Sequence, residues 1–346
     1  MGTFPKALEC FWYAVPGGTS VGNGPCRVRL LEADYVLWRG PAGSVVAALD
    51  VCPHRQSPLS EGTVEAGYLR CPYHGWTFGE AGQCVEVPSA SSAVPVPPRA
   101  HLKSLSVLER YGLVWLCPGE PSEPVPAVAV DAAPAYSRLN TELQTWAAST
   151  SRMIDNFLDI SHFPFTHIGT FGRQQETIVP RIELSQLDET FFGYAYEVVI
   201  NNVGSTKVMS GGGDDIVTLA MSTGFALPFT VRSTMHYENG IHQVLLLTAS
   251  PIDQEHSNFA FVIWRNDDVS LTGEEIVAFE LEVVAEDRAM LERLTGELPL
   301  WPGGTVDVQA DKPAVEWRRR YRLLVEEGPR WSRQAPLVLC LGGGCP

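Results

Sequence analysis

The sequence lacks any run of eighteen apolar residues, the length that a membrane-spanning helix needs. Its first thirty positions also lack a charged leader that is followed by an apolar segment and a small-residue cleavage site. Basic residues are scarce, with 25 against 40 acidic ones, and a formal net charge of −15 repels nucleic acid and anionic membranes. We therefore expect a cytoplasmic protein that binds neither nucleic acid nor a membrane.

Eight cysteines are spread thinly over 346 residues, without the export signal that accompanies a disulfide framework. We interpret them as free thiols or metal ligands. Cys340 and Cys345 stand in an apolar tail, where a single C-x4-C pair is weak evidence for a metal. With 45% hydrophobic and 19% charged residues, the chain can bury a large core, and its length suits one long domain or two ordinary ones.

The pattern of apolar residues divides the chain into two parts. From about residue 27 to 117, short β-rich runs such as YVLWR and GLVWLC are separated by turn residues, which predicts a small all-β unit. The next segment, 118–136, contains five prolines and indicates a linker or boundary. We predict an α+β protein with an N-terminal all-β domain at 1–125 and a second domain at 126–346.

The second part begins with helical spacing at residues 151–162. Longer alternating segments follow, and they predict strands of one antiparallel sheet: FFGYAYEVVI, IVTLAMSTGFALPF, HQVLLLTASPI and NFAFVIWR. Two helices are expected after them, at 272–294 and 313–326. The predicted second domain is therefore an antiparallel sheet flanked by helices.

Two short pairs of metal-binding residues lie in the β-rich part, Cys52-Pro-His54 and, after sixteen residues, Cys71-Pro-Tyr-His74. Two such pairs can clamp a metal centre from opposite sides. Structural zinc accepts two thiolates and two imidazoles, but zinc fingers of that type use a C-x2-4-C pair. The pattern favours a Rieske-type [2Fe–2S] centre, in which two thiolates hold one iron and two imidazoles hold the other.

A second group of such residues lies between 152 and 172, in RMIDNFLDISHFPFTHIGTFG. On a helix, its polar residues Asp155, Asn156, Asp159 and His162 share one side, a pattern that is by itself more typical of a solvated face. His167 changes the interpretation. A proline three positions before it is expected to break the helix, so that both histidines can meet at one point.

Two histidines and one carboxylate form the facial triad that suits Fe(II) and leaves positions open for O2. In the helix expected at 272–294, Asp287 falls within an apolar stripe of Ile276, Phe279, Val283, Met290 and Leu294. A carboxylate on a core-facing stripe is costly unless it is paired or binds a metal. Glu280 is the alternative, although its longer side chain reaches solvent more easily, and Asp287 can also be explained by an ion pair with Arg293 or Arg319.

The first pair of motifs resembles the Rieske domain of Rieske non-haem iron oxygenases, whose C-x-H and C-x2-H pairs stand here as Cys52, His54, Cys71 and His74. Respiratory Rieske proteins carry an extra cysteine pair that bridges the two loops, and no such pair occurs here. The resemblance implies an oxygenase-type [2Fe–2S] cluster held by these four residues.

The run DNFLDISHFPFTH likewise resembles the catalytic motif N-x-x-D-x-x-H-x4-H of the same family. This resemblance implies that His162, His167 and Asp287 bind a mononuclear Fe(II). It implies that Asp159 connects the iron site to a cluster histidine of a neighbouring subunit, and Asn156 matches a nearby polar position of the motif.

The resemblance extends from FWYAV near Phe11 to DKPAVEWRRRY and points to the shorter, α-only class, which includes demethylases and saxitoxin-pathway hydroxylases. It implies a homotrimer that monooxygenates a small, specialised metabolite by hydroxylation or demethylation, using O2 and electrons from a reductase or ferredoxin. Alternatives are arene-type dioxygenation, a structural zinc protein, and a Rieske protein for electron transfer alone. The last leaves more than 200 residues after the boundary without a role.

Two further regions are candidates for substrate contact. Met221, Phe225 and Phe229 are equally typical of pocket walls and of ordinary core. The loop SGGGDDI, with Asp214 and Asp215, is more typical of an exposed turn than of a cover that favours a cationic substrate.

Overall fold

A computed structural model describes residues 4–16, 21–22, 24–91, 93–267, 272–301 and 304–328. The tail at 329–346, with Cys340 and Cys345, lies outside these residues. Among the helices that are described, none combines the length and the apolar character needed to cross a bilayer.

The N-terminal part consists of three small antiparallel sheets, ordered β1-β10-β9, β2-β3-β4 and β5-β6-β7-β8. The predicted all-β unit is confirmed, and it also includes β1, which pairs with β10. The strands are β1 Tyr13–Val15, β2 Cys26–Leu30, β3 Ala33–Arg39, β4 Val45–Leu49, β5 Thr63–Glu65, β6 Tyr68–Arg70, β7 Thr77–Phe78, β8 Cys84–Glu86, β9 Ser106–Arg110 and β10 Leu113–Cys117.

The C-terminal part is built on one eight-stranded antiparallel sheet, ordered β11-β18-β17-β16-β15-β14-β13, with β12 also paired to β18. The four predicted segments all belong to it. The sequence TVRSTMH of β16 was not predicted, because it has only two apolar residues and weak alternation. The strands are β11 Ser137–Asn140, β12 Gln144–Trp146, β13 Ser185–Gln186, β14 Phe192–Asn201, β15 Ile216–Ala226, β16 Thr230–His236, β17 His242–Pro251 and β18 Ser257–Arg265.

The α-helices of the described residues that accompany this sheet are α1 Thr150–Phe157, α2 Phe163–Thr166, α3 Gly204–Met209, α4 Gly273–Leu291 and α5 Lys312–Glu327. The two late helices, α4 and α5, are confirmed. A capping box starts α4, in which the Thr272 side chain accepts from the Glu275 N–H and the Glu275 carboxylate accepts from the Thr272 N–H. The resulting layer of sheet and helices confirms the predicted fold class.

The helix expected at 151–162 is wrong in extent, because α1 already ends at Phe157. The carboxylate of Asp159 accepts hydrogen bonds from the backbone N–H groups of Ser161 and His162, at 2.8 and 3.1 Å. A side chain that binds nearby backbone in this way replaces helical hydrogen bonds with a turn. Pro164 then lies in the first turn of α2, where a proline is tolerated, so it starts a helix and does not break one.

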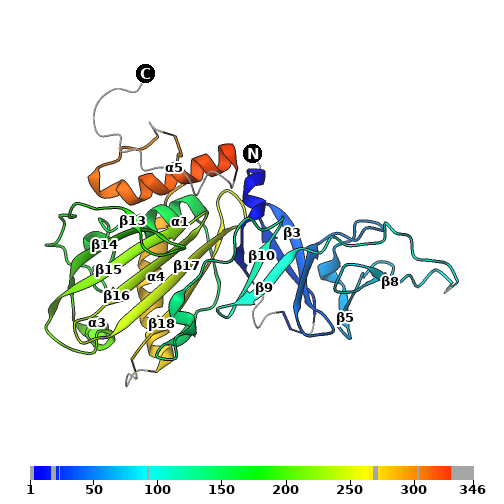
Figure 1. Ribbon diagram of the computed structural model, residues 1–346, viewed down its shortest axis with the longest axis horizontal. Helices are drawn as coiled ribbons and strands as arrows, with labels where there is room; N and C mark the ends of the chain where they lie inside the picture. Colours follow the sequence, from blue (N-terminus) through cyan, green and yellow to red (C-terminus); the bar gives the residue numbers. More distant parts are fainter. Residues whose placement is uncertain are drawn as a thin grey trace.

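The large sheet has protein on both of its faces. Helix α4 crosses one face, while α1 and α5 lie together along one end of the sheet (Figure 1). On the other face, Val244, Leu246 and Trp264 pack against Tyr111 and Trp115 of the N-terminal part. All nine residues of β18 are buried as a result.

The proline-rich segment 118–136 is packed against both parts of the chain. The Tyr111 hydroxyl donates to the Pro126 carbonyl at 3.1 Å, and the Trp264 indole N–H donates to the Asp131 carboxylate at 2.9 Å. Val125 and Val128 are buried between the two parts, and each such side chain contributes about 1.5–3 kcal/mol. The segment is a fixed connector, and the boundary predicted within it at 125/126 stays a prediction.

Two candidate metal sites

The first candidate site lies on two loops of matching construction at the tip of the N-terminal part. One loop follows β4 and contains Cys52, and the other joins β6 to β7 and contains Cys71. Each cysteine carbonyl accepts from the N–H four residues later, of Gln56 at 2.9 Å and of Gly75 at 3.1 Å. Both of these later residues have positive φ, 60° and 70°, so each chain turns sharply enough to bring its Cys and His to one side.

The two histidines of these loops lie against each other. The rings of His54 and His74 have centroids 4.5 Å apart, and Trp76 stacks on His54 at 4.5 Å with an interplanar angle of 5°. Both cysteine side chains are buried, whereas His74 and the neighbouring Tyr73 are exposed. The structure therefore brings the four predicted residues together, with thiols inside and imidazoles toward solvent.

The donor atoms of this site fit a metal cluster. His54 Nδ1 is buried and has no hydrogen-bond partner among the described residues, and a buried polar atom needs a partner such as a metal. Burial and the nearby His74 lower the pKa of His54, which favours the neutral, metal-binding imidazole. Burial raises the pKa of the Cys52 thiol to about 11, so its thiolate needs a cation for stability.

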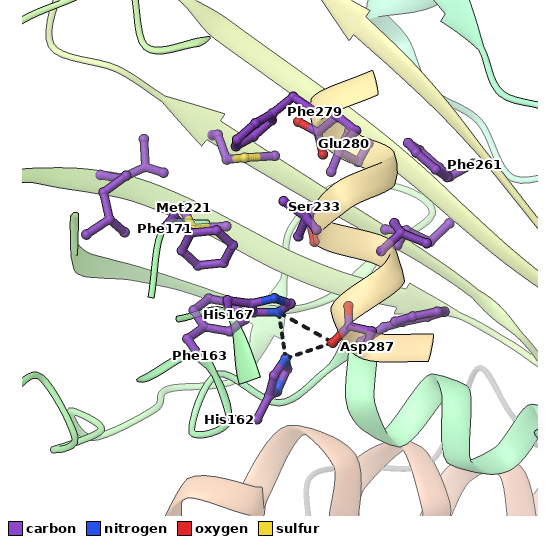
Figure 2. Close-up of a pocket in the computed structure, with 18 of the residues that line it drawn as sticks. His162, Phe163, His167, Phe171, Met221, Ser233, Phe261, Phe279, Glu280 and Asp287 are labelled. Carbon is purple, nitrogen blue, oxygen red and sulfur yellow. Dashed lines mark hydrogen bonds and ion pairs between the residues drawn. The ribbon is translucent and has the colours of Figure 1, made fainter. Parts of the chain in front are cut away.

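The second candidate site joins α2 to α4. His162 and His167 flank the single turn of α2, which returns their Nε2 atoms to 3.1 Å from each other. Asp287, from the inner face of α4, places Oδ1 3.3 Å from His162 Nε2 and 3.4 Å from His167 Nε2 (Figure 2). All three donor atoms lie within 4.8 Å of one another, so a single ion can contact all of them.

Each imidazole of this group is held at its other nitrogen by a carboxylate. Asp159 Oδ2 lies 3.0 Å from His162 Nδ1, and Glu286 Oε2 lies 3.0 Å from His167 Nδ1. A proton on each Nδ1 satisfies these contacts and leaves the Nε2 lone pairs directed at the same point. Two lone pairs 3.1 Å apart require a proton or a cation between them, so the donor set fits a metal.

Glu286 was missed by the sequence analysis. Besides His167, it accepts from the Gly169 N–H at 3.0 Å and from the Thr170 hydroxyl at 2.8 Å. Its place beside Asp287 in the sequence offered no signal, because adjacent helical residues point about 100° apart.

The carboxylates of the second site strongly favour positive charge on the neighbouring histidines. Although burial opposes the shift, hydrogen bonds with Asp159 and Asp287 raise the pKa of His162 to about 9. The same contacts, against burial, lower the pKa of both Asp159 and Asp287. Without a metal, these carboxylates therefore stabilise a proton on His162. A divalent metal can take the place of that proton.

The other polar residues of the predicted helix face divide into two groups. Asn156 donates to Asp287 Oδ1 at 3.0 Å and so belongs to the site. Asp155 points elsewhere, with Oδ1 3.7 Å from Arg318 Nε, and burial raises its pKa to about 6. The predicted set is thus brought together except for Asp155.

Comparisons with known proteins agree with this arrangement. The Rieske [2Fe–2S] domain family matches residues 11–105, and the vanillate O-demethylase oxygenase C-terminal domain family matches 146–327, which is more than half of the chain. Methylxanthine N1-demethylase of Pseudomonas putida is 28% identical over 95% of this chain and 93% of its own. The dicamba O-demethylase oxygenase component of Stenotrophomonas maltophilia is 34% identical over 45% of this chain and 46% of its own. A solved structure of the P. putida demethylase NdmA with caffeine has a TM-score of 0.82 at 27% identity and covers 93% of each chain.

The chain belongs to the Rieske non-haem iron oxygenases. It is an oxidoreductase of the monooxygenase type, which carries a [2Fe–2S] cluster and a mononuclear iron. It uses O2 and electrons from a reductase to oxidise a small organic molecule. The expectations of fold, enzyme class and cofactors are confirmed, and a zinc protein or a protein for electron transfer alone is excluded.

In this oxygenase the histidine and carboxylate group forms one end of a pocket with a cavity volume of about 120 Å³. Its walls are mainly apolar side chains from the sheet, α1, α2 and α4 (Figure 2), and they include Phe163, Phe171, Met221, Phe261 and Phe279. An apolar cavity of ~150 Å³ holds benzene, so this pocket accommodates a molecule of about one ring. The oxygenase therefore presents its second site to a small, largely apolar ligand.

The structure decides between the alternatives for the two regions expected near this pocket. Met221 lines it, whereas Phe225 and Phe229 pack in the core with α5 residues. The loop with Asp214 and Asp215 is an exposed turn, as favoured, in which Asp215 pairs with Lys207 at 2.7 Å.

The apolar stripe of α4 was also assigned incorrectly. Its buried residues are Ile276, Glu280, Val284, Asp287 and Leu291, while Met290 and Leu294 are 44% and 40% exposed. Phe279 and Val283, which were expected in the stripe, line the pocket. In the sequence, their apolar spacing looks the same as that of a helix face packed against the core.

The expectation that Glu280 reaches solvent is wrong. Its side chain is buried, with the residue only 6% exposed, and it accepts a hydrogen bond from Gln243. The alternative ion pair of Asp287 with Arg319 is wrong, because Arg319 donates to Glu316 at 2.8 Å.

Proposed function

We propose that His162, His167 and Asp287 bind the mononuclear iron, and that the cluster is bound by Cys52, His54, Cys71 and His74. The support is the convergence of donor atoms, above all the 3.1 Å between the two Nε2 atoms. A facial arrangement of two imidazoles and one carboxylate leaves the remaining positions open toward the pocket. The orphaned Nδ1 of His54 supports the cluster assignment.

We infer that the reaction is demethylation of a nitrogen or oxygen atom on a small molecule of about one ring. The observation that carries this inference is the apolar pocket that ends at His162, His167 and Asp287. When bound, iron of this type supplies the activation of O2 and the transfer of one oxygen atom into a C–H bond. A methyl group so hydroxylated leaves as formaldehyde, while the second oxygen atom, two electrons and two protons give water. The names of the similar P. putida and S. maltophilia demethylases support this class of reaction.

The residues around the iron site would position both the ligands and the substrate. Asp159 and Glu286 hold His162 and His167 by their Nδ1 atoms, which fixes the ring orientation and keeps Nε2 free for the metal. Asn156 holds Asp287 in the same way through Oδ1. The apolar walls exclude water from the space where the methyl group would lie.

We propose a homotrimer in which each cluster serves a neighbour. The hairpins of the cluster site lie at the opposite end of the long axis from the helices and sheet that form the pocket (Figure 1). A head-to-tail ring of three places unlike ends side by side. Asp159 would then accept from a cluster histidine of the next subunit as well as from His162. The domains in this arrangement are 1–125 and 126–346, and the free cysteines outside the cluster site, such as Cys84 and Cys117, support a cytoplasmic location.

A product assay with isotope-labelled O2 tests the proposed reaction. The purified holoenzyme, with a reductase and a panel of N-methyl and O-methyl single-ring compounds, should release formaldehyde together with the demethylated product. One labelled oxygen atom should appear in the formaldehyde formed in unlabelled water, after rapid trapping. A product that retains its methyl group and gains both oxygen atoms would show dioxygenation and would overturn the proposal.

A further inference from the structure

The pocket contains a second acidic group that the proposed reaction does not use, Glu280 on α4. We propose that Glu280 selects substrates with a positively charged amine at the end of the molecule that lies away from the iron. This inference rests on the proposed function, since it assumes that the pocket holds the substrate.

Helix geometry places Glu280 and Asp287 on one side of the pocket. Seven residues separate them, which is two turns of α4 and a rise of roughly 10 Å. Figure 2 shows both carboxylates on the pocket side of the helix, with Asp287 beside the histidines and Glu280 beyond Ser233. A single-ring molecule spans much of that separation, so one end can meet the iron site while the other meets Glu280.

The carboxylate of Glu280 is held by a neutral partner. Gln243 Nε2 donates to Glu280 Oε1 at 2.6 Å, and Gln243 Oε1 accepts from Arg265 Nη1 at 3.1 Å. The second contact fixes the direction of the Gln243 amide, so its NH2 group faces Glu280. The charge of Arg265 is already matched by Asp267, with two contacts of 2.7 Å. Glu280 therefore has a hydrogen-bond donor but no ionic partner among the side chains that the structure describes around it.

An unpaired carboxylate at such a depth is costly, because Glu280 is only 6% exposed. Burial accordingly raises its pKa to about 7, and the donor Gln243 and the more distant Arg265 oppose that rise only in part. A cation bound in the pocket would supply the missing charge and favour the ionised form.

The charges along the rest of the pocket point to the same ligand. Its described lining includes neither lysine nor arginine, and of its three acidic groups Asp159 and Asp287 belong to the proposed iron site, where the metal offsets their charge, which leaves Glu280 at the other end. A carboxylate or sulfonate at the Glu280 end would meet a like charge without a basic partner, whereas an ammonium group there would find an acceptor. The remaining walls are mostly apolar and suit the body of the molecule.

Three ligands of nearly equal size test this selection: 4-methoxybenzylamine, 4-methoxybenzyl alcohol and 4-methoxybenzoate. They share one ring and one O-methyl group and differ in charge. Calorimetric titration of the anaerobic holoenzyme measures binding without turnover. We expect the amine to bind most tightly and the benzoate most weakly. In Glu280→Gln, the amine affinity should fall by about ten- to a hundredfold while the alcohol changes little.

Glu282→Gln provides a matched control, because it removes the same charge from an exposed position two residues further along α4. It should leave all three affinities unchanged, and iron content should equal that of the wild type in both variants. Three results would each overturn the inference. The two variants could lose amine affinity equally, or Glu280→Gln could keep the wild-type ratio of amine to alcohol affinity. The wild type could also bind benzoate most tightly.

Adding O2 and a reductant to the same mixtures separates this inference from the proposed reaction. Charge-dependent binding without formaldehyde from any ligand would leave the selection intact and contradict demethylation. If all three ligands bound equally well and all released formaldehyde, demethylation would be supported and the selection by Glu280 would be contradicted. Failure of the wild type to bind the amine at all would reject the role of Glu280.

Discussion

The two proposed metal sites of this oxygenase differ in how their histidines are held. At the cluster site, His74 is exposed, and His54 has a stacked tryptophan but, within the described part of the chain, no hydrogen bond on its buried nitrogen. At the iron site, both histidines are anchored by carboxylates, and His167 is 2% exposed. The first arrangement suits a group that meets other proteins, whereas the second suits a group that must keep its geometry while substrate and O2 enter.

The histidines of the two sites are held by different kinds of contact, by carboxylate side chains at the iron site and by loop backbone at the cluster site. Carboxylate partners fix the tautomer of a metal-binding imidazole and raise its basicity, and their loss typically costs ten- to a hundredfold in metal affinity or activity. The cluster histidines depend instead on two loops of matching backbone. Variants that affect one site without the other therefore test whether this division is real.

The largest effect is expected from His162→Ala. Removal of one of three proposed ligands should abolish turnover and the binding of mononuclear iron, while the visible absorbance of the [2Fe–2S] cluster remains. Metal analysis and absorption spectra of the purified variant check this outcome. Loss of the cluster together with the iron would show that the two sites are not separable.

Asp159→Asn should lower turnover by about a hundredfold and retain iron, since the amide can still contact His162 but carries no charge. Steady-state rates and iron content measure the two effects. Ser161→Ala is the matched control, because it removes the 2.7 Å hydrogen bond to the other oxygen of Asp159 and leaves the contact with His162 in place. Similar losses in both variants would indicate that Asp159 acts only by shaping the turn.

Glu286→Gln should weaken iron binding by about tenfold, because His167 loses a charged acceptor at Nδ1. Competition with a chelator gives the affinity, and Glu282→Gln again serves as the control on the same helix. An affinity equal to that of the wild type would mean that Gly169 and Thr170, not His167, are the partners that require Glu286.

The last expected effect concerns the pH dependence of stability. Glu280 has a pKa of about 7 in the folded protein and the usual lower value when unfolded. Its contribution to stability is therefore present below the unfolded pKa and is lost as the pH rises toward 7 and above. Relative to Glu280→Gln, the wild type should lose at most about 3 kcal/mol between pH 5 and pH 8.

Chemical unfolding of both proteins at several pH values measures this difference. The charged and titratable groups near Glu280 are Arg265, Asp267 and Tyr237, and burial raises the pKa of Tyr237 far above the range tested. Parallel pH profiles for the two proteins would contradict the assignment.

The comparison also shows which parts of the site were predictable from the sequence. The residues proposed for the cluster form two local motifs, so spacing alone is enough to predict Cys52 and His74. The iron site combines distant segments, and Asp287 was predicted because an acidic residue in an apolar stripe is costly. Glu286 and the role of Glu280 were not predictable, since both depend on partners that only the folded chain brings near, His167 and Gln243.

The main error in the predicted secondary structure, the length of the helix at 151–162, arises because a side chain competes with the helix for backbone N–H groups. The periodicity at 151–162 is helical throughout, but the side chain of Asp159 captures backbone N–H groups that a longer helix would have used. Cavities account for the error in α4, because a wall of Phe279 and Val283 around a pocket has the same apolar spacing as a helix face against solid core. Sequence periodicity cannot separate these two surroundings.

The packed connector at 118–136 gives the molecule a fixed length between its two iron-binding ends. Because Trp264 and Tyr111 tie this segment to both parts, the reach of the cluster hairpins toward a neighbouring copy is decided when each chain folds. In the proposed ring of three, the diameter is therefore determined by the length of the folded monomer.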